Sequence, residues 1–424
     1  MKILVVGAGG REHAIIKKLG ESPKVREIHC APGNGGIAAQ GVKCVPIKAT
    51  DVDAMMDYAS QQAFDLVVVT PDDPLVLGMV DALQAKGIPA FGPNKAAAAI
   101  EGSKAFAKEL MERYHIPTAR HKSFSDPSAA LEHIKNLGEW PVVIKADGLA
   151  LGKGVVIAQD LDEAQSAVQQ MLVDKAFGKS GETVIIEQFL SGPEVSVLAF
   201  CDGQTVVPMV SAMDHKQAFD GNLGPNTGGM GAIAPNPHYT AEIAERCMRE
   251  IFLPTLKAMQ SEDRPFKGCL YFGLMLTSQG PMVIEYNCRF GDPEAQVVLP
   301  LLETDLVDIM LAINDGNLCE LDIRWKPGAS ACVVLASGGY PGTYPVGLPI
   351  EGLDKAGDLP GSRAAICHAG TKLASSDRFI TAGGRVLSIC AVGNDLQDAL
   401  DKAYAAVQSI SFEGMHYRTD IGTH

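Results

Sequence analysis

The feature that most constrains the fold is a short apolar run at the start of the chain that ends in glycines. Residues 3–6 read ILVV, residues 7–10 read GAGG, and residues 11–20 carry apolar side chains at helical spacing. A buried strand, a tight turn and a helix in that order open a βαβ unit. The sequence therefore predicts an open parallel sheet flanked by helices at the N-terminus.

The glycine turn after this strand is compatible with three uses. A dinucleotide fingerprint would need glycine at position 12, where Glu12 stands, and an acidic residue near positions 28–30, which read IHC. The spacing therefore disfavours a nicotinamide cofactor. A phosphate cradle at the helix N-terminus, with Arg11 beside it, fits the sequence better. A turn that only joins strand to helix is equally consistent.

Further apolar runs in the first hundred residues end in similar loops. Residues 31–36, 71–74 and 92–94 read APGNGG, PDDP and GPN, and each segment follows an apolar run. Open α/β sheets bind ligands beyond the carboxyl ends of their strands, so these loops would share one edge of the sheet. The pattern predicts a Rossmann-like domain over residues 1–103 and a long helix over residues 96–115.

Length and a change of pattern set the remaining domain boundaries. A chain of 424 residues is too long for a single core. Beyond residue 326, short predicted strands alternate with glycine turns, which indicates a small β-rich domain. The predicted domains that follow the first are a central domain over residues 104–325, with a lobe of its own at about 117–192, and a C-terminal domain over residues 326–424.

Charge and cysteine usage argue against several functional classes. The formal net charge is −14 and no run of five like charges occurs, which disfavours nucleic acid and anionic membranes as partners. The 10 cysteines include no C-x-x-C pair, a pattern typical of thiols in a reducing compartment. No apolar run is long enough for a signal peptide core or a membrane span. We therefore expect a soluble, cytoplasmic protein.

A glycine-rich hairpin tip carries a lysine in the central domain. Residues 145–154 read KADGLALGKG between two predicted strands, and Lys153 lies near the tip. A Walker loop would precede a helix, so this segment is not one. Backbone N–H groups and a lysine on such a flap can cover phosphates, while a loose surface hairpin is the alternative. We expect residues 148–154 to be poorly ordered without nucleotide.

Two further segments of the central domain offer ligand contacts. Glu194 begins a predicted strand after an apolar connector, where its carboxylate could accept hydrogen bonds from ribose hydroxyls, or could simply be a solvated charge. Residues 214–235 are rich in glycine and show no obvious element, which indicates a functional or disordered loop. Asp214 and Lys216 open this loop, and residues 226–229 offer backbone donors.

The most informative stretch for chemistry is residues 283–294, which read VIEYNCRFGDPE. Alternate residues of a strand share a face, so Glu285 and Asn287 project together while Tyr286 faces the other way. A carboxylate and an amide carbonyl suit Mg²⁺, which completes its shell with water and substrate phosphates. Arg289 follows as a cation for a carboxylate or phosphate. The alternative is an ordinary strand end with solvated charges.

The order of these features resembles a known layout. A lysine before a glycine flap, a strand with a connector, and a Glu-x-Asn strand resemble the ATP-grasp fold, in which ATP lies between two α+β lobes. The sequence motifs resemble those of the family of phosphoribosylamine–glycine ligases, or glycinamide ribonucleotide synthetases, from the first residues to the last. The motifs that carry this resemblance are GAGGREHA, APGN, IKADGLALGKGV, GPNTGGMG, EYNCRFGDPE, HAGTK, TAGGRVL and YRTDIG.

The resemblance implies an ATP-dependent carbon–nitrogen ligase of de novo purine biosynthesis. Such an enzyme phosphorylates the carboxylate of glycine, and the amine of 5-phosphoribosylamine then attacks the glycyl phosphate. The products are glycinamide ribonucleotide, ADP and phosphate. The resemblance further implies Mg²⁺ or Mn²⁺ as the metal and ATP as co-substrate. Its partners would be small molecules, with transient contacts to neighbouring purine-pathway enzymes.

The same resemblance implies roles for individual positions. Glu285 and Asn287 match metal ligands, and Arg289 and Lys216 match catalytic positions. The positions that match ATP contacts are Lys104, Lys145, Lys153, Glu187, Leu190 and Glu194. The positions that match contacts to glycine and the phosphoribosyl group are Gly9, Gly10, Arg11, Asn34, Asp214, Thr227 and Gly228.

Two departures from the family pattern bear on these expectations. Many ATP-grasp enzymes carry a metal carboxylate on the preceding strand, but residues 271–276 read YFGLML, so a second metal ion would need another ligand. Asp72 stands where the family has glutamate, and its shorter reach leaves it outside the predicted site. The chain ends soon after YRTDIG, which favours a stand-alone ligase.

Three alternative functions remain open on the sequence. A carboxylase-type relative would release ADP in dependence on bicarbonate in place of glycine. A nicotinamide oxidoreductase would show a nicotinamide-dependent change in absorbance. A non-catalytic nucleotide-binding regulator would tolerate Glu285→Ala. The intact set of Lys145, Glu285, Asn287 and Arg289 favours an active ligase over the regulator.

Overall fold

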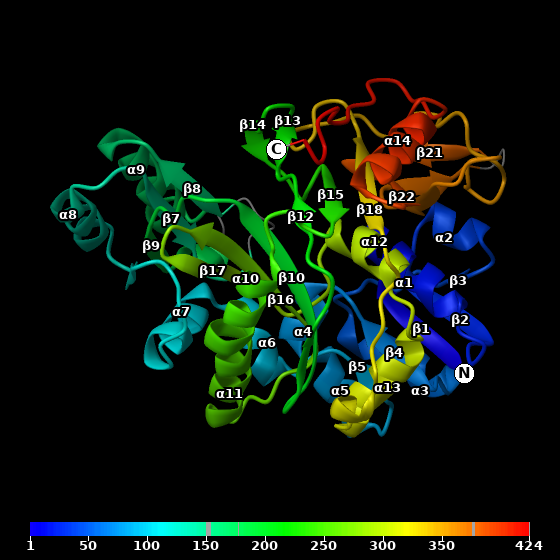
Figure 1. The fold of residues 1–424 in the computed structure, drawn as a ribbon, viewed down its shortest axis with the longest axis horizontal. Coiled ribbons are helices and arrows are strands. Elements are labelled where there is room, and N and C mark those ends of the chain that lie inside the picture. Colours follow the sequence, from blue (N-terminus) through cyan, green and yellow to red (C-terminus); the bar gives the residue numbers. More distant parts are fainter. Residues whose placement is uncertain (150–153, 177, 375–377, 424) are drawn as a thin grey trace.

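The N-terminal part is built on an open parallel sheet, as the sequence predicts. The computed structural model describes residues 1–149, 154–176, 178–374 and 378–423, arranged as in Figure 1. The sheet has five strands in the order β3-β2-β1-β4-β5. These are β1 (Lys2–Gly7), β2 (Glu27–Pro32), β3 (Lys43–Cys44), β4 (Leu66–Val69) and β5 (Ala90–Phe91). The helices are α1 (Gly10–Gly20), α2 (Gly35–Ala39), α3 (Val52–Gln62), α4 (Asp72–Leu77) and α5 (Met79–Ala85). Every residue of β4 is buried, as expected for a strand covered on both faces.

The single long helix predicted over residues 96–115 is wrong, because the chain forms two helices there. They are α6 (Lys95–Gly102) and α7 (Lys104–Arg113). Ser103 between them is extended, and its Oγ accepts a hydrogen bond from Phe106 N at 3.1 Å as the N-cap of α7. The Asp147 carboxylate accepts from Ser103 Oγ at 3.2 Å and from Ala105 N at 3.1 Å. The break therefore places the start of α7 against the base of the glycine flap.

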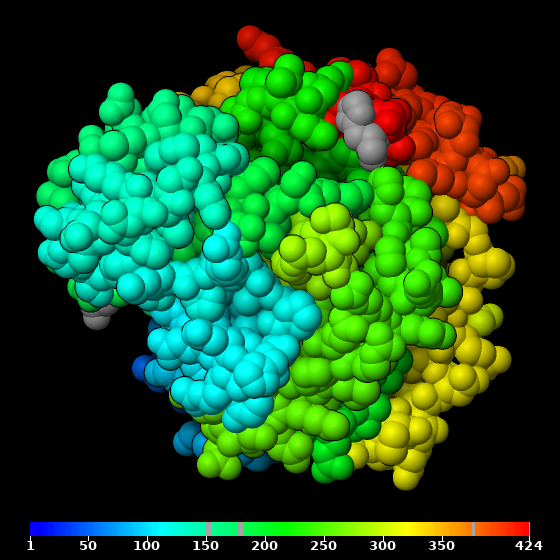
Figure 2. All heavy atoms as spheres, turned by 60° about the vertical axis from the view of Figure 1, so that its left-hand side comes forward, coloured from blue at the N-terminus to red at the C-terminus, as the bar shows by residue number. Residues whose placement is uncertain are grey.

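Two antiparallel four-stranded sheets form the central part, in the orders β6-β9-β7-β8 and β11-β10-β16-β17. The first contains β6 (His121–Phe124), β7 (Val142–Ala146), β8 (Val155–Ala158) and β9 (Val184–Gln188). The second contains β10 (Glu194–Asp202), β11 (Val206–Pro208), β16 (Lys267–Thr277) and β17 (Gly280–Asn287). Their helices are α8 (Pro127–Leu137), α9 (Leu161–Val168), α10 (Ala241–Cys247) and α11 (Leu253–Ser261), with short turns η1 (Gln169–Val173), η2 (Gly178–Gly181) and η3 (Met248–Phe252). The first sheet packs with α8 and α9 around a core of its own, and Figure 2 shows this lobe projecting from the side of the molecule.

The glycine-rich loop expected over residues 214–235 contains four short strands. They are β12 (Met213–Asp214), β13 (Gln217–Phe219), β14 (Leu223–Asn226) and β15 (Gly231–Ala234). β13 and β14 form a two-stranded hairpin, whereas β12 and β15 join the C-terminal sheet in the order β12-β15-β18-β22-β19. Local glycine content concealed these strands, and β18, the partner of β15 in the C-terminal sheet, lies about a hundred residues further on.

The C-terminal part is rich in strands, as predicted. Its elements are β18 (Ala329–Ala336), β19 (Ala365–His368), β20 (Thr371–Leu373), β21 (Phe379–Thr381), β22 (Arg385–Gly393) and α14 (Leu396–Val407). α14 packs on β18 and β22 and completes an apolar core that includes Ile233 of β15. The central and C-terminal parts therefore share one sheet, and Figure 1 shows β15 beside β18.

The segment after β17 forms two helices separated by a short turn. It forms α12 (Glu294–Val298), the turn η4 (Leu299–Leu301), α13 (Leu306–Asp315) and the turn η5 (Leu318–Glu320). Pro300 interrupts the first helix, and Asp305 caps the second by accepting from Val307 N at 2.9 Å. Among the described residues, none of these or the other helices has the length and apolar character needed to cross a membrane.

Candidate active site

β17 carries the two oxygen ligands that the sequence predicts. Tyr286 is buried against Phe272 of β16, whereas Glu285 and Asn287 lie on the opposite, partly exposed face. A register shift in the β16–β17 hairpin places Gly273 opposite Glu285, and a Cβ at Gly273 would lie 3.0 Å from Glu285 Cγ. Gly273 thus leaves room for the glutamate side chain to point into the site.

Cations surround the Glu285 carboxylate. Burial opposes its ionisation, but three lysines and Arg289 outweigh burial and hold the pKa of Glu285 below its ordinary value. The lysines are Lys216, Lys145 and Lys104. Lys216 Nζ lies 4.0 Å from Glu285 Oε1. Glu285 is therefore ionised at neutral pH, as a metal ligand must be.

The donor set on β17 fits magnesium. Glu285 supplies a carboxylate, and Asn287 Oδ1 accepts a hydrogen bond of 3.2 Å from Arg289 Nη2. β16 carries no carboxylate beside them, and the described part of the chain contains no cluster of three or more His, Cys, Asp or Glu side chains able to hold a metal. A pair of protein oxygens suits Mg²⁺, which takes the rest of its shell from water and substrate phosphates.

Glu187 and Lys145 belong to a buried ion cluster with a third member that sequence reasoning missed. Glu187 Oε1 lies 3.0 Å from Lys145 Nζ, and Oε2 lies 2.8 Å from Lys108 Nζ. Lys145 Nζ also donates to Ile284 O on β17 at 3.1 Å. Burial lowers the pKa of Lys108 to about 8, although Glu187 opposes the shift. Both carboxylate oxygens of Glu187 are therefore engaged by lysines, and Lys145 is fixed beside the metal strand.

The remaining positions expected at the nucleotide lie around this cluster. Lys104 Nζ donates to Gly148 O at 2.6 Å, at the base of the flap. Burial lowers the pKa of Lys104, and the Glu285 charge opposes that shift. Leu190 is partly buried on the connector after β9. Lys153 lies outside the described residues, as does most of the flap tip whose disorder was expected.

Lys216 lies between Glu194 of β10 and Glu285 of β17, and Asp214 lies two residues before it. Lys216 Nζ donates to Glu194 Oε2 at 2.7 Å. Burial disfavours the Lys216 charge, but Glu194 and Glu285 raise its pKa well above the ordinary value. Asp214 Oδ1 is buried and accepts no hydrogen bond within the described part of the chain. Burial and the Glu294 charge raise the pKa of Asp214, and a cationic group placed beside it would favour its ionised form.

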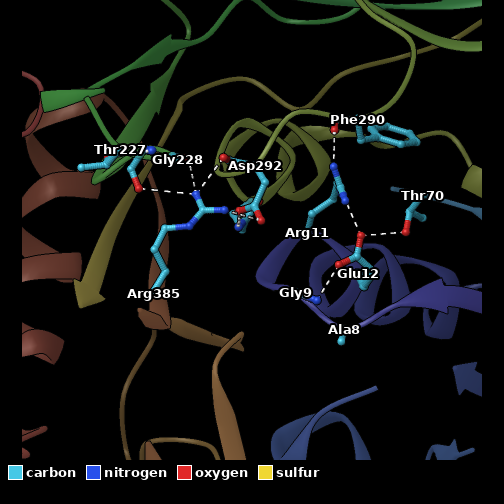
Figure 3. A network of polar contacts seen from close by, with 12 residues as sticks. Ala8, Gly9, Arg11, Glu12, Thr70, Thr227, Gly228, Phe290, Asp292 and Arg385 are labelled. Atoms are coloured by element: carbon cyan, nitrogen blue, oxygen red, sulfur yellow. Dashed lines mark hydrogen bonds and ion pairs between the residues drawn. The ribbon is translucent and has the colours of Figure 1, made fainter. Parts of the chain in front are cut away.

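The first glycine turn is filled by a carboxylate of its own helix, as Figure 3 shows. Glu12 Oε2 accepts from Gly9 N at 2.5 Å, and Glu12 Oε1 lies 2.6 Å from Arg11 Nε and 2.7 Å from Thr70 Oγ1. Arg11 Nη1 donates to Phe290 O at 3.1 Å. A phosphate placed in this turn would meet the Glu12 charge, so the structure argues against the phosphate cradle expected there.

Asn34 also makes its hydrogen bonds within the protein. Its Nδ2 donates to Ala8 O and to His368 O, each at 2.8 Å. A Cβ at Gly36 would lie 2.0 Å from His368 Cγ, so the glycines of this loop permit close contact with the C-terminal part. His13 Nδ1 accepts from His368 N at 2.8 Å. Three separate sequence motifs, GGREHA, APGN and HAGTK, therefore meet at one interface.

Arg385 of β22 holds two loops together, one at Gly228 and one at Asp292 (Figure 3). Its Nη1 donates to Gly228 O and, at 2.8 Å, to Asp292 O, and its Nη2 lies 2.8 Å from Asp292 Oδ2. The expected backbone donor Gly228 N is used internally, because it donates to Tyr340 OH at 3.0 Å. Thr227 Oγ1 likewise donates to a backbone carbonyl ahead of β13 at 2.8 Å.

A cavity of about 460 Å³ opens between the N-terminal and C-terminal parts. The N-terminal part contributes Gly9 and Asn34 to its lining, and the C-terminal part contributes Thr371, Lys372 and Arg385. A larger, mainly apolar cavity of about 700 Å³ beside α10 and α11 contains none of the predicted site residues. The smaller cavity is the one with polar groups suited to a charged sugar.

Sequence reasoning overlooked several residues that shape the site. Lys108 follows Lys104 by one helical turn, so the two lysines share a face of α7, and that spacing could have revealed it. Arg385 and Glu101 gave no such signal, because their partners at Asp292 and at residues 288–289 are distant in sequence. Asp72, left outside the predicted site, lies 4.0 Å from Arg289 Nη2.

Comparison with protein families matches most of the chain to the three domains of one synthetase. Residues 1–101 match the family described as phosphoribosylglycinamide synthetase, N domain. Residues 102–295 match its ATP-grasp (A) domain, and residues 330–424 match its C domain.

Individual relatives agree with this match. The phosphoribosylamine–glycine ligase of Caldanaerobacter subterraneus is 46% identical over 99% of both chains. That of Salmonella typhimurium is 47% identical over all of this chain and 98% of its own. The crystal structure of the phosphoribosylamine–glycine ligase of Thermotoga maritima is 32% identical over all of both chains, with a TM-score of 0.86. A biotin carboxylase domain of Hydrogenobacter thermophilus, solved with MgADP and bicarbonate, shares the fold at 16% identity and a TM-score of 0.75, over 98% of this chain and 91% of its own.

Proposed function

The chain belongs to the phosphoribosylglycinamide synthetase family, and from that premise we propose how its residues divide the work of the reaction. The protein is an ATP-grasp ligase that joins glycine to 5-phosphoribosylamine and so forms glycinamide ribonucleotide in purine biosynthesis. The resemblance seen in the sequence is thereby confirmed. The metal, the site residues and the individual steps below are proposals.

We propose that Glu285 and Asn287 hold Mg²⁺, for which Mn²⁺ can substitute. The support is an ionised carboxylate and an amide oxygen on one face of β17, with a lysine-rich surround suited to phosphates. When bound, the metal would neutralise phosphate charge and so make the γ-phosphorus a better electrophile. The biotin carboxylase neighbour was solved with MgADP.

The nucleotide would lie between the two four-stranded sheets. Lys104, Lys145 and Lys153 would bind its phosphates, and Glu187 would act by fixing Lys145 rather than by direct contact. Leu190 and the connector would contact the adenine, and Glu194 the ribose. The observation that carries this assignment is the convergence of Lys145, Lys216 and Glu285 at one end of β17.

Glycine would lie next to the γ-phosphate. Arg289 suits its carboxylate, and the unpartnered Asp214 Oδ1 suits its ammonium group. A glycine carboxylate oxygen attacks the γ-phosphorus, the bond to the β–γ bridging oxygen breaks, and ADP leaves with that electron pair. Lys216 and Arg289 would neutralise the negative charge that develops during this transfer.

Phosphoribosylamine would occupy the cavity between the N-terminal and C-terminal parts. Its amine attacks the glycyl carbonyl carbon, inorganic phosphate leaves with the carbon–oxygen electron pair, and the new amide nitrogen loses a proton. Gly9 and Asn34 would form the floor of this cavity. We propose Gly10, Arg11, Thr227 and Gly228 as further contacts to the glycine and phosphoribosyl groups. Because Glu12 occupies the glycine turn, we assign the 5-phosphate to the opposite wall, where Lys372 and Arg385 lie.

The remaining expectations are proposals of the same kind. We place domain boundaries at residues 1–103, 104–325 and 326–424, with the flap lobe at about 117–192. All ten cysteines are free thiols, which supports a reducing, cytoplasmic setting. The partners would be the small-molecule substrates, with neither nucleic acid nor membrane, and transient contacts to neighbouring purine-pathway enzymes.

The deciding experiment is ADP release by purified protein with Mg²⁺-ATP, glycine and freshly made phosphoribosylamine, with each component omitted in turn. We expect release to require both co-substrates. Release that persists without glycine but needs bicarbonate would assign the protein to the carboxylase branch. No release in any combination, from folded protein that still binds ATP, would overturn the proposed function.

A further inference from the structure

Glu101 is a buried carboxylate outside the machinery described so far. It is the penultimate residue of α6, ahead of the central sheets, and is 7% exposed. Its Oε2 accepts a hydrogen bond of 2.7 Å from Cys288 N, and its Oε1 lies 3.1 Å from Arg289 Nη2. One carboxylate therefore binds both the backbone and the side chain at the end of β17. It lines neither of the cavities described above.

The contacts of Arg289 show what Glu101 controls. Nη2 is shared between Glu101 Oε1 and Asn287 Oδ1, and Nη1 donates to Phe290 O at 3.3 Å. Arg289 Nε is buried and donates to no acceptor within the described residues. The guanidinium is thus anchored through its terminal nitrogens, while Nε is left for a ligand.

We infer that Glu101 is a positioning residue, which orients Arg289 toward the carboxylate of glycine and fixes Asn287 at the metal strand. The inference rests on the proposed function and names a residue that sets the affinity of the glycine position. A guanidinium binds a carboxylate through two parallel N–H groups, so its plane must be fixed before the substrate arrives. The Cys288 bond fixes the backbone between Asn287 and Arg289, and the ion pair fixes the plane.

The contact also keeps two competing interactions apart. Arg289 Nη2 donates to Asn287 Oδ1, the same oxygen proposed as a metal ligand. Without Glu101, this arginine would keep Asn287 and the more distant Asp72 among its polar side-chain neighbours. Glu101 shares Nη2 with Asn287, so part of the bonding of the guanidinium is directed away from the proposed metal ligand.

The test is a double-mutant cycle on Glu101→Gln and Arg289→Lys. Glutamine can still accept from Cys288 N but cannot pair with a cation, and lysine keeps the charge of Arg289 but loses its planar fork. The matched control is Glu262→Gln, which removes an ion pair with Arg113 that also joins two distant segments. ADP release is measured while glycine and ATP are varied separately.

We expect Glu101→Gln to lower kcat/KM for glycine by about 10–100-fold, as loss of a partner that orients a ligand typically does. The KM for ATP should stay close to that of the control, whereas the midpoint of thermal unfolding should fall, because the substitution leaves the Arg289 charge without its buried partner. In the double variant the losses should not add, because both substitutions remove the same oriented guanidinium. Calorimetric titration of glycine into protein loaded with Mg²⁺-ADP supplies a readout independent of turnover, and should show weaker binding by a similar factor.

Additive losses, or equal changes in the KM values of glycine and ATP, would show that Glu101 only joins α6 to β17 and would overturn the inference. If Glu101→Gln does not fold, the same double-mutant cycle is measured with Glu101→Asp, which keeps the charge but shortens the side chain, and Arg289→Lys. Wild-type protein that lacks glycine-dependent ADP release would overturn the proposed function as well. The inference fails alone when the wild type is active and the cycle is additive.

Discussion

The nucleotide side and the sugar side of this site are built by different means. On the nucleotide side, Glu285, Lys145 and Lys216 present charges, and Lys108 with Glu187 holds one of them in place. On the proposed sugar side, Asn34 and Arg385 at the cavity already bond to other groups of the protein, as Arg385 does with Asp292. The first region concentrates charge that a ligand must match. The second is a packed interface between domains that leaves a shaped space.

The difference lies in where the information for each region is held in the chain. On the nucleotide side, residues that act together are spaced as on one strand or one helix, as Glu285 and Asn287 are, so a short stretch of sequence reveals them. The sugar side depends on glycines such as Gly36, whose importance appears only when His368 lies against it. The following substitutions test this contrast, beginning with the largest expected effect.

The largest effect is expected where charge is buried. Glu187→Gln leaves Lys108 and Lys145 without their shared counter-charge, and both side chains are at most 5% exposed. Removing one partner from a buried ion cluster costs about 3–5 kcal/mol. Urea denaturation should show that loss, whereas Glu262→Gln, in a more exposed pair with Arg113, should leave the free energy of unfolding nearly unchanged. Equal costs for the two variants would contradict a nucleotide side organised by buried charge.

Glu285→Ala should affect activity far more than folding. The side chain is 36% exposed and its proposed partner is a metal ion, so its removal leaves no cavity in the core. We expect kcat to fall by about 10²–10³-fold, the scale of losing one preorganised electrostatic group. ADP release and binding of Mn²⁺ by electron paramagnetic resonance measure the two consequences. Glu303→Ala, an exposed carboxylate away from β17, is the control, and unchanged Mn²⁺ affinity in Glu285→Ala would disprove the metal assignment.

These two variants concern residues that the sequence did reveal. Alternation along residues 283–287 predicted which side chains face the site, and the structure agrees because β17 is regular from Glu285 to Asn287. The parallel sheet could also be predicted, since β1 and β4 are apolar runs that end in loops. The sheet that β15 and β18 share could not be predicted, because the pairing of a strand depends on which distant segment lies beside it in the folded chain. Lys108 could have been predicted from its spacing to Lys104. Glu101 and Arg385 could not, because they act through contacts that exist only in the folded chain.

Gly36→Ala tests the interface on the sugar side. A Cβ there would lie 2.0 Å from His368 Cγ, so the C-terminal part must shift away from the first domain. Overpacking of this kind costs about 1–3 kcal/mol, and we also expect a raised KM for phosphoribosylamine with little change for ATP. Gly20→Ala is the matched control, because nothing lies within 4 Å of its added Cβ. A variant with unchanged KM for phosphoribosylamine would separate this interface from the sugar site.

The smallest effect we expect is a pH dependence of the same interface. Burial, together with the nearby Lys17 cation, lowers the pKa of His13 from 6.5 to about 3, and burial lowers the pKa of His368 to about 4. The unfolded chain therefore binds more protons than the folded chain between pH 6.5 and those values. The stabilising contribution is complete above pH 6.5 and is lost as the pH falls, by at most about 1.4 kcal/mol per pH unit for each histidine.

His13→Asn separates that titration from packing. Asparagine can still accept from His368 N through Oδ1 but does not titrate, so the slope of the unfolding free energy between pH 6.5 and 5 should fall by about half of the part that these two histidines contribute. Urea denaturation at several pH values measures the slope, with a substitution at the exposed His238 as control. An unchanged slope would mean that His13 charges without disturbing the interface. The sugar side would then tolerate a buried charge as the nucleotide side does, and the contrast between the two regions would rest on the glycine contacts alone.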